Sequence, residues 1–346
     1  MGVVAVLAIA GLLILSGLYV TKYLPPRARV LTVEDHSYQA RQIADRAVYL
    51  AFFEGSVSGI GDIAREILDH VIEEEALRRV GATTVDAVTP ADIERELNLD
   101  LGLIEDDPSP TATPEATATA DPSATAEGTA TAEATGTAEA TADPTAEATI
   151  DPQAFADALT TFLRNTGLSR AEYEAIIEAR LYRQRLRDHF KAEVGSSGVQ
   201  VRLQRIRVST QLAADQTIAA LEAGGDFALL ADEQSVATED GEGGEIGWTA
   251  GVLQSDDVQA AIADLEPGQW TAPITSGLFF EIYLVAEVAE DRAYETAIVT
   301  SLTRVRLDDW LATTIASLDV DEDLSADEES WINDRVLADV TSRLGG

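Results

Sequence analysis

The side chains that most often carry out acid–base chemistry or bind metals are scarce in this sequence. It has 346 residues with 3 histidines and no cysteine. His36, His70 and His189 stand far apart, and none has a second histidine or a carboxylate at the spacing of a zinc motif such as HExxH. The lack of cysteine excludes disulfides, thiolate nucleophiles and cysteine-ligated zinc. We therefore expect neither a metal site nor a bound cofactor.

The most suggestive short segment is the glycine-rich stretch Glu242–Val252, which has the sequence EGGEIGWTAGV. A phosphate-binding loop would need GxxxxGK followed by Ser or Thr, and a dinucleotide-binding loop would need GxGxxG between a strand and a helix. Neither pattern occurs here. Glycine also permits tight turns, because it adopts positive φ without a steric cost. The neighbouring segments must decide whether this stretch is a turn or part of a larger motif.

Charge argues against nucleic acid as a partner. The chain carries 24 Lys and Arg against 61 Asp and Glu, which gives a formal net charge of -37. Binding to phosphates by counterion release needs a basic face. The short run Arg183, Arg185 and Arg187 lies among acidic neighbours, and we expect it to form a solvated helix face.

Residues 3–20 form an uninterrupted apolar run, VVAVLAIAGLLILSGLYV, close to the roughly 20 residues that a membrane-spanning helix requires. The apolar region of a cleaved signal peptide is shorter, about 7 to 15 residues, and no small-x-small cleavage site follows before Lys22. We expect a single uncleaved anchor at residues 1–22. Lys22, Arg27 and Arg29 after it favour a cytoplasmic location for the rest of the chain by the positive-inside rule.

Residues 105–150 point the other way. They consist almost entirely of Thr, Ala, Glu, Asp, Pro, Ser and Gly, with no aromatic or basic residue. Such a segment cannot bury enough apolar area to offset its ordering entropy, so we expect a disordered spacer. It is either an unmodified linker or a glycosylated stalk, and both suit the exterior. We expect a single-pass protein of the cell membrane whose bulk is extracytoplasmic.

Helix signals lie on both sides of this spacer. Ile63, Ile67 and Val71 recur at the period of a helix with one buried stripe. Thr89, with proline directly after it and an acid three residues on, is a strong helix start, and Ser169 opens a capping-box pattern. Because closing a long loop costs little, about 0.6 kcal/mol for each doubling of its length, the two helical blocks can form one domain.

The pattern changes after residue 198. Residues 199–208, VQVRLQRIRV, and 279–285, FFEIYLV, alternate and are rich in β-branched or aromatic residues, which predicts strands. Helices are expected at residues 213–221, 226–231 and 257–265. The fold class is therefore α+β, with a small antiparallel sheet of βαααβ type.

The order of motifs in this region resembles the parvulin-type (PpiC, or rotamase) peptidyl-prolyl isomerase domain. That family runs from a strand through G-x-D-F-x-x-L-A-x-x-x-S, G-G-x-L-G-W and L-x-x-G-x-x-x-x-P-V to a closing strand. Several ordered motifs over about ninety residues are far more specific than one glycine pair. The matching residues here are Gly225, Asp226, Phe227, Leu230, Ala231, Ser235, Gly243, Gly244, Gly247, Trp248, Leu265, Gly268 and Pro273.

The flanking helical segments resemble the N-terminal module of membrane-associated foldases of the SurA and PrsA type. From this resemblance we expect a helical module at residues 30–104 and 151–198, split by the spacer at 105–150. A parvulin-like domain follows at 199–291, and a helical C-terminal region covers 292–346. In that last region we expect Trp310 and Trp331 to be packing anchors rather than ligand contacts.

The resemblance implies two facing histidines and a Cys or Asp near the prolyl amide, with Met or Leu and Phe holding the ring. Here Arg205 and Glu281 stand at the histidine positions and Ala237 at the Cys or Asp position, and no histidine lies between residues 199 and 290. The catalytic set is thus unknown. The predicted substrate-binding set consists of Leu253, Val258, Phe227, Trp248 and Phe280.

Arg205 and Glu281 are expected on adjacent strands, where they can form an ion pair. An arginine that polarises the prolyl carbonyl is the catalytic interpretation. The alternative, which we favour, is a structural pair that contributes little if it is exposed.

These observations favour a foldase on the outside of the membrane whose parvulin-like domain binds unfolded or proline-containing polypeptides with weak or no isomerase activity. One alternative is a working isomerase that acts through its pocket and backbone electrostatics. The other is a non-catalytic envelope scaffold that holds a fixed partner.

Overall fold

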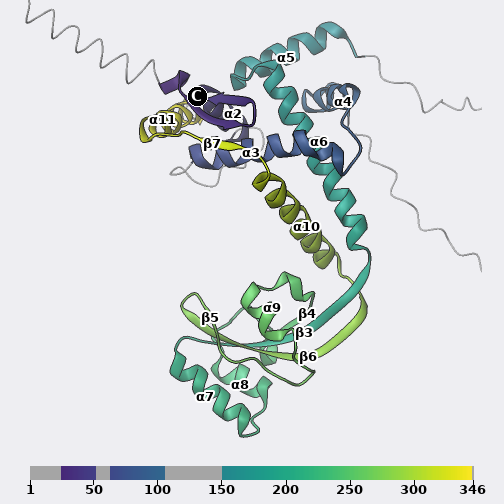
Figure 1. The fold of residues 1–346 in the computed structure, drawn as a ribbon, viewed down its shortest axis with the longest axis vertical. Helices are drawn as coiled ribbons and strands as arrows, with labels where there is room; N and C mark the ends of the chain where they lie inside the picture. The colour runs from purple at the N-terminus through teal and green to yellow at the C-terminus, as the bar shows by residue number, and fades with distance from the viewer. Residues whose placement is uncertain (1–24, 52–62, 106–149, 345–346) are drawn as a thin grey trace, which may run out of the picture.

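The computed structural model describes residues 25–51, 63–105 and 150–344. They form a helical module and a smaller sheet domain, joined by two neighbouring connections (Figure 1). Mixed helices with small antiparallel sheets confirm the α+β expectation. Within the described ranges, no helix is long and apolar enough to cross a bilayer. The predicted anchor at 1–22 and residues 106–149 of the predicted spacer lie outside these ranges.

Helices make up most of the module, and their starts follow the capping signals. Thr89 and Ser169 each accept a hydrogen bond from the backbone of the third helical residue and complete a capping box. The predicted helix starts at these two positions are confirmed. The helices of this part are α2 (Ala40–Tyr49), α3 (Ile63–Val80), α4 (Pro90–Asp100), α5 (Pro152–Thr166) and α6 (Arg170–Val194).

A three-stranded sheet in the module was not predicted. Strands β1 (Arg29–Val33) and β2 (His36–Gln39) form a hairpin where the sequence predicted only helix. The third strand, β7 (Val320–Glu322), comes from the C-terminal region and pairs with β1 in the order β2-β1-β7. The helical module predicted at 30–104 thus also contains strands, and β1 takes one of its two neighbours from almost 300 residues away.

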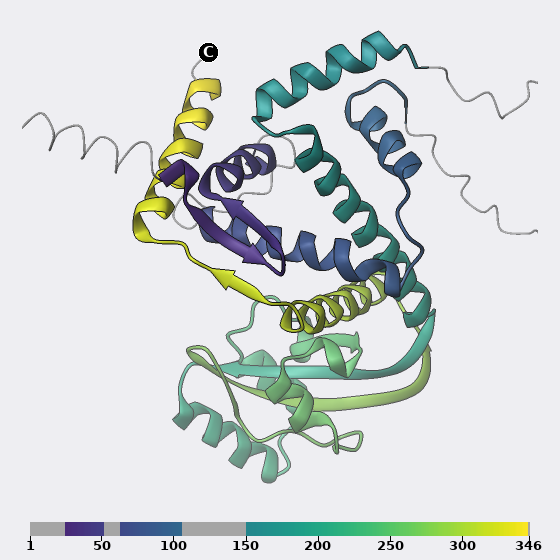
Figure 2. The same ribbon diagram turned by 45° about the horizontal axis from the view of Figure 1, so that its top comes forward.

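The C-terminal region is built into the helical module. Helix α10 (Thr296–Ala316) packs along α6, and α11 (Ala326–Leu344) packs against α2, so β7 and both helices close the module (Figure 2). Trp310 is half-buried and donates its Nε1–H to Thr84 Oγ1 at 3.1 Å, and Trp331 packs on the main core. Their predicted role as packing anchors is confirmed.

Two of the three arginines expected on a solvated face instead connect helices. Arg183 on α6 pairs with Glu73 on α3. Arg185 pairs with Asp92 on α4 at 2.9 Å. The sequence could not show this, because the partner carboxylates lie about 100 residues earlier in the chain.

The sheet domain spans residues 197–293. Its antiparallel sheet has the order β4-β3-β6-β5, with the long strands β3 and β6 in the centre. Helices α7 and α8 cover one face, where Ile206 and Ile282 are fully buried, and α9 covers part of the other. The elements are β3 (Ser197–Val208), α7 (Gln211–Glu222), α8 (Phe227–Gln234), β4 (Glu245–Thr249), α9 (Asp256–Ile262), β5 (Ile274–Ser276) and β6 (Phe279–Ala293).

A buried carboxyl in the helical module gives a pH-dependent prediction. Asp45 on α2 lies beside Gly167, and burial raises its pKa from 3.8 to about 6 although Arg41 is only 3.5 Å away. Between these pH values the Asp45 carboxyl is ionised in the unfolded chain but protonated in the folded chain. The free energy of unfolding therefore falls as pH rises through this window. A shift of about two pKa units corresponds to about 3 kcal/mol.

We expect Asp45→Asn to be more stable than the parent by about 1–3 kcal/mol at pH 7 and to match it near pH 4. Urea unfolding of both proteins between pH 4 and 7 measures this difference. A difference that does not change with pH would contradict the assignment to Asp45.

Candidate polar site on the sheet

Four polar side chains of strands β3 and β6 share one face of the sheet. Arg205 lies opposite Tyr283, and Arg207 lies opposite Glu281. Side chains two residues apart point to the same face of a strand, and the intervening Ile206 and Ile282 fill the core on the other face. The alternating sequences RIR and EIY therefore place these polar groups side by side.

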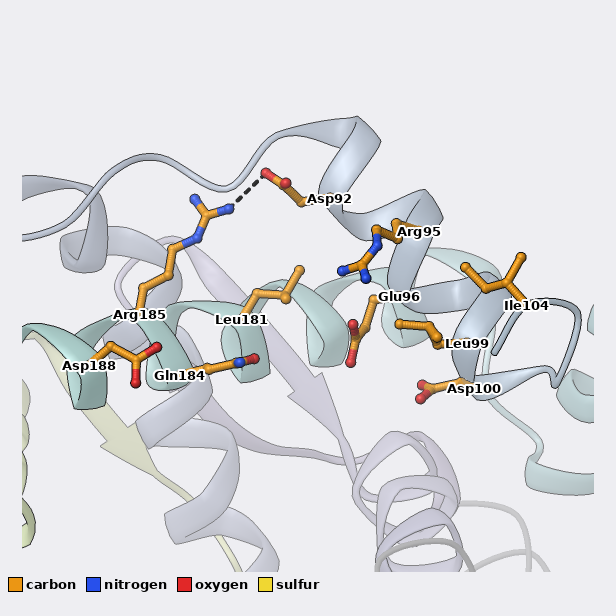
Figure 3. Close-up of a pocket in the computed structure, with 10 residues that line it drawn as sticks. All are labelled: Asp92, Arg95, Glu96, Leu99, Asp100, Ile104, Leu181, Gln184, Arg185 and Asp188. Carbon is orange, nitrogen blue, oxygen red and sulfur yellow. Dashed lines mark ion pairs between the residues drawn. The ribbon is translucent and has the colours of Figure 1, made fainter. Parts of the chain in front are cut away.

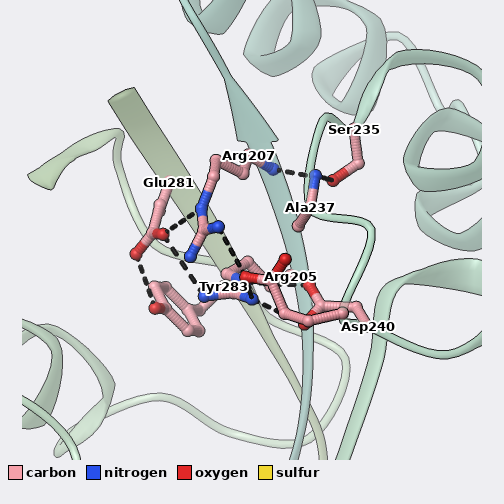
Figure 4. A network of polar contacts seen from close by, with 8 residues as sticks. Arg205, Arg207, Ser235, Ala237, Asp240, Glu281 and Tyr283 are labelled. Carbon is pink, nitrogen blue, oxygen red and sulfur yellow. Dashed lines mark hydrogen bonds and ion pairs between the residues drawn. The ribbon is translucent and has the colours of Figure 1, made fainter. Parts of the chain in front are cut away.

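Arg205 is the hub of this network (Figure 4). Its Nε donates to Asp240 Oδ2 at 2.8 Å, and its Nη2 donates to Asp240 Oδ1 at 2.5 Å and to Glu239 Oε1 at 2.8 Å. Its Nη1 donates to Glu281 Oε1 at 3.3 Å. These four hydrogen bonds use four of the five N–H donors of a guanidinium.

Glu281 is the second hub. It is 3% exposed, and its Oε1 also accepts from Arg207 Nε at 2.6 Å, while its Oε2 accepts from the Tyr283 hydroxyl at 2.7 Å. Arg207 reaches Glu239 with its Nη1 as well. Burial, together with the hydrogen bond to Glu281, raises the pKa of Tyr283 to about 12. Burial alone would lower the pKa of Arg205, but Asp240 and Glu281 raise it.

This arrangement corrects the sequence-based expectation in one respect. The ion pair between Arg205 and Glu281 is confirmed, but it is not exposed, since the Arg205 side chain is only 12% accessible. The pair also belongs to a larger network. Four of the five N–H donors of its central arginine already bind carboxylates.

Ala237 lies at the edge of the network, in the loop after α8. Its N–H donates to Ser235 Oγ at 3.3 Å, and the same hydroxyl accepts the backbone N–H of Arg207 at 3.1 Å (Figure 4). The three residues expected at the polar positions of the site, Arg205, Ala237 and Glu281, are thus brought together. Sequence reasoning missed Arg207, Tyr283, Glu239 and Asp240. The alternation in RIR and EIY could have found the first two.

The sheet domain resembles a known family. The model of the rotamase family, described as the PPIC-type PPIASE domain, matches residues 200–287. Because this match falls within the sheet domain, we call residues 197–293 the PpiC domain. No curated protein matches the sequence.

Several solved structures resemble the chain. PrsA from Bacillus anthracis is 14% identical, with 78% of this chain and 97% of that chain covered and a TM-score of 0.36. The foldase protein PrsA from Streptococcus pneumoniae is 12% identical, with 89% and 99% covered and a TM-score of 0.32. NmPin, the parvulin of Nitrosopumilus maritimus, is 25% identical, with 26% and 97% covered and a TM-score of 0.23.

The five residues predicted to bind substrate do not come together in one groove of the PpiC domain. Phe227 and Phe280 pack with Ile206 on the face covered by α7 and α8. Val258 belongs to α9 and is buried against the other face of the sheet. Trp248 is half-buried, with the Arg292 guanidinium 4.3 Å from its ring centre.

Leu253, the fifth of these residues, contacts the helical module. It lies in the short turn Gly251–Leu253 and packs with Ile298 and Leu302 on the first turns of α10. Leu253 is therefore part of the contact between the PpiC domain and α10. The sequence could not show this, because it does not place α10 relative to the sheet.

An apolar rim borders the polar network. Leu278 and Phe279, at the turn between β5 and β6, are 87% and 37% exposed. The Arg207 guanidinium lies 5.7 Å from the centre of the Phe279 ring. Val236 is also exposed, and it lies beside strand β3, because its N–H donates to the backbone oxygen of Arg207 at 2.8 Å. We call Leu278, Phe279 and Val236 the apolar rim.

The glycine-rich stretch packs closely against the backbone of strand β3 at Arg205. Gly243 and Gly244 have φ of 69° and 74°, and a Cβ on Gly244 would lie 2.2 Å from the backbone oxygen of Arg205. Only glycine fits this close approach. The motif is therefore a packing requirement of the PpiC domain.

We expect Gly244→Ala to lower the stability of the PpiC domain by about 3 kcal/mol or more, because strain at positive φ adds to a backbone clash. Gly247→Ala is the matched control. Gly247 has φ of 94° with no heavy atom within 4 Å of the added Cβ, so it meets strain alone. Thermal unfolding of the two variants compares them, and an equal loss would show that the contact with Arg205 does not matter.

Proposed function

We propose that this chain is a protein-folding factor, anchored at the cell membrane with its bulk outside. Its PpiC domain binds unfolded or extended polypeptide and has weak or no isomerase activity. The observation that carries this proposal is that Asp240, Glu239 and Glu281 bind four of the five N–H donors of Arg205, which stands where the family resemblance implies a catalytic histidine.

The chemistry of prolyl isomerisation explains the weight of this observation. Rotation about the peptide bond meets a barrier of about 18–20 kcal/mol, and a catalyst lowers it by stabilising the twisted amide. A donor must be free to reach the prolyl carbonyl or nitrogen. In this network, four of the five donors of Arg205 and the hydroxyl of Tyr283 already bind carboxylates.

Binding of a client needs only accessible apolar surface. The apolar rim offers it beside the network, and exposed Glu239 adds a negative charge at the edge. An extended client can bury its own apolar side chains on Leu278 and Phe279 without any covalent step. Membrane anchorage rests on the apolar run at residues 3–20, and the exterior location rests on the composition of residues 105–150.

The test is the affinity for an unfolded model protein. We expect Leu278→Ser combined with Phe279→Ser to weaken binding about tenfold or more, because burying one large apolar side chain contributes about 1.5–3 kcal/mol. Leu212→Ser with Leu229→Ser is the matched control, since both leucines are exposed on α7 and α8. Equal affinities for parent and rim variant would remove the rim from the client site.

A further inference from the structure

A hollow in the helical module has properties that the PpiC domain does not provide. Residues of α3, of the end of α10 and of strand β7 line it, and its volume is about 500 Å³. Figure 1 shows these three elements close together. Volumes of about 300–1,000 Å³ are typical of ligand sites. We call it the α3–β7 hollow.

Its floor is aliphatic. Ile72 is buried at its base, while Ile315, Leu318 and Val320 are half-buried and contribute to its wall. Apolar atoms exposed in a concave site gain from being covered by another apolar group.

All charged residues that line the hollow are acidic: Asp69, Glu73 and Glu322. Glu73 pairs with Arg183. Asp69 and Glu322 are exposed and form no ion pair with any residue that the structure describes. The hollow therefore has an apolar floor under an uncompensated negative rim.

A larger polar hollow between α4 and α6 does not combine an apolar floor with unpaired carboxylates (Figure 3). It is lined by charges of both signs, and Arg185 binds Asp92 across it at 2.9 Å. Arg180 pairs with Glu96 and Asp100 in the same region. Its carboxylates are thus largely neutralised within the chain.

We propose that the α3–β7 hollow is a second polypeptide site, which takes a short segment with apolar side chains flanked by lysine or arginine. This inference rests on the proposed function and specifies the class of client. Apolar side chains would cover Ile315, Leu318 and Val320, while cationic side chains would meet Asp69 and Glu322. The net charge of -37 would also attract cationic segments over longer distances.

Charge also disfavours two other occupants. The chain's own residues 106–149 carry acidic but no basic side chains, so the rim would repel them. A second copy of the chain would bring another net charge of -37. A cationic client is the occupant that complements both the floor and the rim.

The experiment uses two fluorescent nine-residue peptides on the full chain. One has two leucines flanked by lysines, and the other has the same leucines flanked by glutamates. We expect the lysine peptide to bind and Asp69→Lys with Glu322→Lys to weaken that binding at least tenfold. Asp264→Lys with Asp334→Lys is the matched control, because it makes the same change in net charge at exposed positions away from the hollow.

Equal weakening by both double variants would show attraction to net charge alone and would overturn the site. Unchanged binding in both, or equal binding of the glutamate peptide, would overturn it as well. The rim variant Leu278→Ser with Phe279→Ser separates the two proposals. If this variant loses client binding but still binds the lysine peptide, the apolar rim is the client site and the hollow is a separate site. If it keeps client binding but loses peptide binding, the peptide binds at the rim and the proposal for the hollow is overturned.

Discussion

Arg205→Ala is expected to lower the free energy of unfolding of the PpiC domain by about 3–5 kcal/mol. Among the described residues, Arg205 is the only cation paired with the buried carboxylate of Asp240, and it is one of two cations paired with Glu281, which keeps Arg207. The substitution therefore leaves Asp240 as an uncompensated buried charge, which is costly. Urea unfolding followed by tryptophan fluorescence measures the change.

Arg202→Ala is the control for this prediction. Arg202 lies on the same strand and pairs with Glu245 at 2.9 Å and Glu287 at 2.7 Å, but it is more exposed than Arg205. Exposed pairs contribute little because water screens them. If both alanine variants lost the same stability, the network would not be the structural hub described above.

The second large effect concerns catalysis. We expect the parent chain to accelerate isomerisation of a short Ala-Pro peptide at least about 100-fold less than an active parvulin, because general acid–base assistance typically contributes 10²- to 10⁴-fold. Exchange between cis and trans peptide, followed by NMR, measures the rate without a coupling enzyme. A rate within a few-fold of the active enzyme would favour the histidine-free isomerase.

Local signals made much of the fold predictable. The capping-box patterns that begin at Thr89 and Ser169, each within four residues, correctly predicted the starts of two helices. The alternation of polar and apolar residues around Ile206 and Ile282 correctly predicted the two central strands. Each of these patterns depends on near neighbours in the chain, so sequence alone contains it.

The parts that sequence missed depend on distant partners. Strand β1 pairs with β7, and Leu31 lies opposite Glu322. Leu253 packs on α10 instead of lining a groove with Val258. For the same reason, the resemblance identified the positions of Arg205 and Glu281 but not the carboxylates of Glu239 and Asp240, which a loop brings to the sheet.

The central claim is that the PpiC domain binds clients with weak or no catalysis of isomerisation, and one refolding experiment tests it most directly. The client is a model protein whose slow refolding phase is limited by a prolyl bond, which takes tens of seconds or longer. We predict that the chain raises the yield of folded client while the rate of the slow phase stays unchanged. A slow phase that accelerates in proportion to chain concentration, and loses this acceleration in Tyr283→Phe, would contradict the account.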